Sequence, residues 1–182
     1  MKKSLLISVL VVLIGGFFAS SLVADSNHDR RHDDILVKFK GGIGVIPISN
    51  VVVAADGAIT VNRNTVRGVN SPGQIWRIGD LKAKVKVNGH IRVDGQGLLL
   101  AGGNNIGTNS NQSVRARLFC GTDVHESNLV PLEANGDFKI DDILTPVSPT
   151  DTPVPPNPCT TPLLLILNAG GNWFAAGIPD LD

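Results

Sequence analysis

The sequence predicts an all-β protein, folded as a single antiparallel β-sandwich domain with one disulfide bond. Short runs in which apolar and polar residues alternate recur along the chain, as expected of half-buried strands. Turn-forming residues separate these runs, since the 182 residues include 20 glycines and 11 prolines. No segment has the apolar spacing of an amphipathic helix, and the length suits one domain with its own core.

The N-terminus has the layout of a secretory signal peptide. A positive start at residues 1–3 precedes an apolar run over residues 5–18 and a stretch of small residues at 19–24. The alternative is an uncleaved anchor helix, because residues 5–24 are just long enough to span a bilayer. The glycine pair inside the apolar run and the drift to Ala and Ser favour cleavage after Ala24. We therefore expect export to the periplasm or the medium.

The mature chain is expected to begin with a polar flexible tail, residues 25–34, which contains no apolar residue to bury. Residues 35–182 form the predicted β-sandwich domain. Residues 146–162 hold seven of the prolines and favour an extended course. This proline-rich loop is placed inside the domain and is not an interdomain linker, because a strongly apolar run follows it at residues 163–167.

Two cysteines, Cys120 and Cys159, remain after signal removal. An oxidising compartment would pair them, and the alternative is two buried free thiols. A bond between them closes a loop of about 40 residues, which on the chain-entropy model is worth about 4 kcal/mol.

The first strands are predicted at residues 35–40 and 43–48, joined by a turn at the glycine pair 41–42. Pro47 cannot donate a ladder hydrogen bond, so the second of these strands is placed at a sheet edge. Residues 51–53 and 59–61 are weaker runs that predict short strands or loop.

The clearest element is a hairpin over residues 81–87 and 90–93, because Asn88-Gly89 suits a type I′ turn. Further strands are predicted at residues 98–100 and 113–120, on either side of a glycine- and asparagine-rich loop. Later strands are predicted at 129–132 and 138–143, as a second hairpin, and at 163–167 and 172–178.

The solvent-facing side of the predicted hairpin at residues 81–93 carries a basic stripe, made of Lys82, Lys84, Lys86 and Arg92. Such a stripe could bind an anionic glycan or lipid. The alternative is that these charges protect a sheet edge from aggregation. Trp76 and Trp173 could stack on a sugar, but their apolar neighbours favour the core.

The candidates for chemistry are few. Only His90 and His125 lie in the predicted folded part, and either could serve with Asp123 in a secreted hydrolase, with or without the help of a metal ion. A surface loop explains the group around His125 equally well. His28 and His32 could bind a metal only if the polar tail became helical. We therefore predict no catalytic, cofactor-binding or metal-binding residues. The only residues to which we assign a role are Cys120 and Cys159, as a disulfide bond.

Three runs, FKGGIGVIPIS, GQIWRIGDLKAKVKVNGHIRVDGQGLLLAGGNNIG and PLLLILNAGGNWFAAGIP, together resemble a group of uncharacterised exported bacterial proteins. The resemblance implies export and a β domain and transfers no site residues. Separately, the run NGDFKI looks like the turn and strand of Ig-like or transthyretin-like extracellular modules, which implies a sandwich of that kind.

The function expected from these features is a secreted or cell-envelope module that binds a partner or has a structural role. Its partner would be a protein, a glycan or an envelope component. Nucleic acid is excluded because the mature chain has a net charge of about −2 and few aromatics. No membrane contact is expected after signal cleavage, and the oligomeric state is left open.

Overall fold

The computed structural model describes residues 34–181. The predicted signal peptide and all but the last residue of the predicted tail lie outside the described residues. Within residues 34–181 the regular structure consists of strands alone, which confirms the all-β prediction. The strands are β1 (Ile35–Gly44), β2 (Ile48–Val53), β3 (Ile59–Arg63), β4 (Trp76–Arg77), β5 (Asp80–Lys86), β6 (His90–Gln96), β7 (Leu99–Leu100), β8 (Ser113–Cys120), β9 (Asp123–Glu126), β10 (Val130–Pro131), β11 (Phe138–Ile143), β12 (Thr145–Pro146), β13 (Leu163–Asn168) and β14 (Trp173–Pro179).

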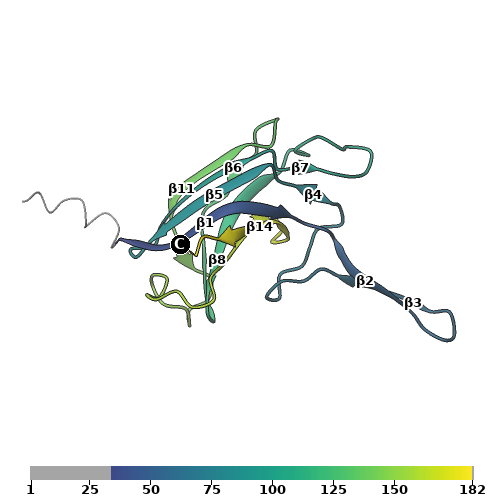
Figure 1. Ribbon diagram of the computed structural model, residues 1–182, viewed down its shortest axis with the longest axis horizontal. Coiled ribbons are helices and arrows are strands. Elements are labelled where there is room, and N and C mark those ends of the chain that lie inside the picture. The colour runs from purple at the N-terminus through teal and green to yellow at the C-terminus, as the bar shows by residue number, and fades with distance from the viewer. Residues whose placement is uncertain (1–33, 182) are drawn as a thin grey trace, which may run out of the picture.

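Ten of these strands form one antiparallel sheet, in the order β11-β6-β5-β1-β14-β13-β8-β9-β12, with β10 also paired to β8. The sheet curls over on itself, so that β11, β6, β5 and β1 form one layer and β8, β13 and β14 the other (Figure 1). The curl brings the two ends of the sheet together, because β10 contacts β11. A hydrogen bond of 2.7 Å from the backbone amide of Asn128, which precedes β10, to the Asp142 carboxylate of β11 also links the two ends of the sheet.

The core lies between the two layers and is one continuous cluster of apolar side chains. Side chains on alternate positions of the strands form this core, since every second residue of β5, β6 and β8 is buried. In β13 both faces are buried, and residues 64–70 bind the neighbouring strand β14. There the Trp173 indole donates to the Asn64 carbonyl at 3.0 Å, and Val69 joins the core.

The predicted hairpin at Asn88-Gly89 is confirmed as β5 and β6. Gly89 has φ of +82°, the left-handed conformation that a tight hairpin turn requires. Neither strand is at an edge, because β5 lies between β6 and β1 and β6 lies between β11 and β5.

The predicted turn at the glycine pair 41–42 is wrong. β1 runs unbroken through it, with a β-bulge between Phe39 and Gly42 where β1 pairs with β14. Gly41 takes φ of +89° there, so a bulge absorbs the glycines that the sequence suggested for a turn. β1 is also an interior strand, and Pro47 lies in the connection that follows it.

The second predicted hairpin is also wrong, although both of its strands exist. β10 pairs with β8, whereas β11 pairs with β6. The reason lies in packing: Phe138 is opposite Gly95 in the β11–β6 register, and its ring occupies the space that a side chain at Gly95 would need. The short local turn at residues 133–136 is present, with the Gly136 amide bonded to the Glu133 carbonyl at 2.8 Å.

β2 and β3 form a hairpin that projects away from the curled sheet (Figure 1). Its register pairs Val51 with Val61 and Val53 with Ile59, which puts all four on one face. Each of the four is more than half exposed, so this face packs on nothing within residues 34–181. The two weak runs predicted as strand or loop are therefore strands, but outside the core.

Cys120 and Cys159 form the predicted disulfide bond, with their Cα atoms 4.7 Å apart. The bond ties the proline-rich loop to the end of β8. Two hydrogen bonds reinforce it, from the Gly121 amide to the Thr160 carbonyl at 2.7 Å and from the Arg67 guanidinium to the Thr161 carbonyl at 3.2 Å. These contacts fasten the loop to the folded body.

Candidate functional site

The outer face of β1, β5, β6 and β11 carries a hollow of about 420 Å³, which we call the basic trough. Its charged lining consists of Lys38, Lys40, Lys82, Lys84, Arg92, Lys139, Asp94, Asp141 and Asp180. Six cations and three carboxylates make the trough a positively charged surface, although the full chain has a net charge of zero.

Strand register brings these cations together. Lys38 of β1 lies opposite Lys84 of β5, and Lys84 lies opposite Arg92 of β6. Lys40 lies opposite Lys82 in the next outward-facing row. Like charges directly opposite one another in a sheet destabilise it, so the fold tolerates a local cost here.

Only part of this charge is neutralised within the described chain. Asp141 accepts from Arg92 at 3.0 Å, and Lys82 pairs with Asp80 at 2.9 Å. Lys38, Lys40 and Lys84 have no carboxylate within 4.0 Å among residues 34–181. Three cations are therefore available to an anion from outside.

The carboxyl group of Asp141 is the main counter-charge at one end of the trough. His90 lies 2.5 Å from it on one side, and Arg92 lies on the other. The hydrogen bond from His90, helped by the charge of Arg92, holds the pKa of Asp141 below its ordinary value of 3.8. Asp141 is therefore ionised at neutral pH, and its two carboxylate oxygens are already hydrogen-bonded to His90 and Arg92.

Five of the six cations of the trough lie on interior strands of the sheet, and Lys139 lies on the terminal strand β11. This weakens the edge-protection explanation for the basic stripe. Charges discourage strand addition only where a strand has an unpaired edge. β5 and β6 are paired on both sides, so their lysines protect no edge. Lys86 also lies on β5 but does not line the trough.

Of the two predicted histidines, only His125 is brought near Asp123, because both bind Thr152. His125 is fully buried, and its Nε2 lies 2.8 Å from the Thr152 carbonyl. Asp123 accepts from the Thr152 hydroxyl at 3.0 Å. Both side chains thus fasten the proline-rich loop to β9, while His90 lies with Asp141 and has no contact with Asp123 among the described residues.

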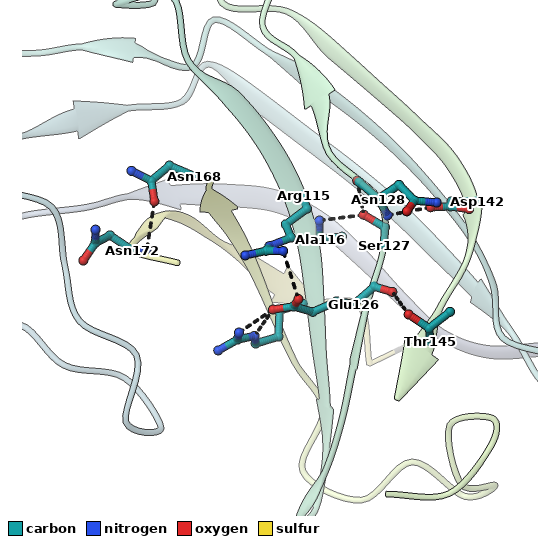
Figure 2. Close-up of polar contacts among 10 residues, drawn as sticks. Arg115, Ala116, Glu126, Ser127, Asn128, Asp142, Thr145, Asn168 and Asn172 are labelled. Carbon is teal, nitrogen blue, oxygen red and sulfur yellow. Dashed lines mark hydrogen bonds and ion pairs between the residues drawn. The ribbon is translucent and has the colours of Figure 1, made fainter. Parts of the chain in front are cut away.

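A second ionic group, which the sequence reasoning missed, joins β8 to β9 (Figure 2). Glu126 is nearly buried and accepts from Arg117 and from Arg115, the latter at 3.3 Å. The Thr145 hydroxyl bonds to the Glu126 carbonyl and adds β12 to the group. The alternation of Arg115 and Arg117 in the predicted strand was the available signal, but nothing in sequence spacing identifies Glu126 as their partner.

The remaining candidates have other roles or lie elsewhere. Trp76 and Trp173 are each 4% exposed, which confirms their placement in the core. His28 and His32 lie outside the described residues. Within residues 34–181 no three metal-ligating side chains gather, and no helix is long and apolar enough to cross a membrane.

The disulfide bond is compatible with a location outside the cytoplasm, where such bonds persist. Comparison of the chain with protein-family models, with curated proteins and with solved structures found no match to any of them.

Proposed function

We propose that the protein is an exported, non-catalytic binding module of the periplasm or the extracellular medium, and that its basic trough binds an anionic glycan. The observation that carries this is the set of lysines that have no carboxylate partner among residues 34–181, Lys38, Lys40 and Lys84, on interior strands where charge serves no edge protection. Export stays a prediction from the first 24 residues and is supported by the disulfide bond.

The shape of the trough favours a chain-like ligand over a membrane surface. A flat bilayer touches the rim of a hollow and leaves its floor unused, whereas a polymer segment can lie inside it. Along a strand, residues on one face recur about every 7 Å, and neighbouring strands are about 5 Å apart. The cations therefore form a grid that a glycan with repeated carboxylate, sulfate or phosphate groups can follow.

The test measures binding of the mature protein to an immobilised polyuronate and to a sulfated glycan at low and physiological salt. Exposed charge contacts are worth about 0.5–1 kcal/mol each, so Lys38→Ala/Lys84→Ala should weaken binding about five- to thirtyfold. Lys86→Ala is the matched control and should change binding little. Binding should also fall as salt rises.

Equal losses in the double variant and in Lys86→Ala would refute the role of the trough. Binding only to vesicles of anionic lipid, and to neither glycan, would replace the glycan with a membrane. The enzymatic alternative has its own test, because His90→Ala should leave any measured phenotype intact if the protein is non-catalytic. His125 is buried and binds Thr152, so His125→Ala is interpreted only where thermal unfolding shows that the variant is folded.

A further inference from the structure

A second hollow, of about 280 Å³, lies beside β4 where the loop of residues 101–112 faces β14. We call it the amide crevice, because five carboxamide side chains line it: Gln74, Asn104, Asn105, Gln112 and Asn168. None of its lining residues is charged, which distinguishes it from the basic trough.

Two of the lining residues, Trp76 and Phe174, are buried core aromatics at the base of the crevice, 4% and 2% exposed. The rings of Trp76 and Phe174 are stacked with centroids 4.0 Å apart and planes 14° apart. The Trp76 amide donates to the Val45 carbonyl at 3.2 Å, and Trp76 is paired with Leu100 of β7. A Cβ at Gly44 would collide with the Trp76 backbone, so this aromatic residue is seated closely on β1.

The amides on the walls are largely free to bind a ligand. Within residues 34–181 the side chains of Gln74, Asn104 and Asn105 make no hydrogen bond that meets normal geometry. Asn109 of the same loop differs, since it does not line the crevice and donates to the Leu132 carbonyl at 3.0 Å and to the Glu133 carbonyl. Asn109 thus fastens the loop to residues 132–133, whereas the carboxamides of Asn104 and Asn105 are available to a ligand in the crevice.

The side of the crevice nearest β13 is partly fixed in orientation. The Asn168 carboxamide oxygen accepts from the Asn172 amide at 2.8 Å (Figure 2). This bond leaves the Asn168 NH₂ group as the free donor. Gln112 makes one weak bond, from Nε2 to the Ser110 carbonyl at 3.3 Å, so its carboxamide oxygen is open as an acceptor.

We propose that the amide crevice binds one neutral sugar unit of a glycan. A carboxamide both donates and accepts, which matches the hydroxyl groups of a sugar. The buried aromatic pair beneath leaves little ring surface open, so recognition rests on the carboxamides. An apolar ligand would leave the amides unpaired, and an anion would find no cation. The volume lies at the small end of ligand pockets, which fits a single ring.

The experiment titrates the mature protein with neutral oligosaccharides of glucose, mannose, galactose and N-acetylglucosamine, and follows tryptophan fluorescence and calorimetric heat. We expect saturable binding to at least one of them with a change in fluorescence. Asn104→Ala and Gln112→Leu should each weaken binding about tenfold, since each removes about one hydrogen bond. Gln96→Ala, an exposed amide on β6, is the matched control and should have no effect.

Two further variants separate this proposal from failure of folding and from the basic trough. Trp76→Phe should keep the heat of binding and lose most of the fluorescence change. Lys38→Ala/Lys84→Ala should leave neutral sugar binding unchanged even if it abolishes binding of anionic glycans. Absence of saturable binding to the whole panel, or equal weakening by Gln96→Ala, would overturn the proposal.

Discussion

Removal of the Cys120–Cys159 bond should destabilise the domain by about 4 kcal/mol. The cysteines are 39 residues apart in sequence, and the entropy of closing a loop of that length in the unfolded chain gives this figure at 25 °C. The loss corresponds to about a thousandfold decrease in the folding equilibrium constant. For a folded region of this size it lowers the melting temperature by about 8–16 °C.

The native contacts around the bond should survive its removal. Thr152 is still held by Asp123 and His125, and the Gly121 amide still bonds to Thr160. The principal effect is therefore on the unfolded chain, which gains freedom, and not on the folded state. The denaturant dependence of unfolding should also steepen, because a chain without the cross-link exposes more surface.

The assay is urea unfolding of the mature protein, oxidised and reduced, followed by tryptophan fluorescence. The variant Cys120→Ala/Cys159→Ala should match the reduced protein and should not respond to reductant, which serves as the control. A loss below about 1 kcal/mol in both would show that the unfolded chain gains little freedom when the cross-link is removed, and would refute the entropy argument.

Two other changes test the packing of the domain. Gly95→Ala should destabilise it by about 1–3 kcal/mol, because the added Cβ would overlap the Phe138 ring on the neighbouring strand; thermal unfolding measures this. Val53→Ser should change the free energy of unfolding by less than about 0.5 kcal/mol, because the apolar face of the β2–β3 hairpin packs on nothing in the described chain; urea unfolding measures that.

Each of these has a matched control. Gly73→Ala should leave the melting temperature nearly unchanged, because no atom lies within 4 Å of the Cβ it would add. Val85→Ser should cost several times more than Val53→Ser, because Val85 is fully buried. A tolerated Gly95→Ala, or a large loss from Val53→Ser, would contradict the packing described here.

The basic trough could be foreseen only in part. The alternation of Lys82, Lys84 and Lys86 along one strand predicted the stripe, because a period of two puts them on one face. Lys38 belongs to the trough because β1 pairs with β5, and pairing between distant strands leaves no mark in local sequence. The amide crevice was not foreseen at all, since its residues come from four separate segments.

What the sequence by itself determined is what local chemistry decides. Alternating side chains predicted most of the strands, Asn88-Gly89 specified its hairpin, and two cysteines together with a predicted export signal favoured their bond. Tertiary structure alone decided which strands pair. It turned Gly41-Gly42 from a turn into a bulge, because β5 and β14 hold β1 extended on both sides, and it moved β11 from β10 to β6, where Phe138 fills the space over Gly95.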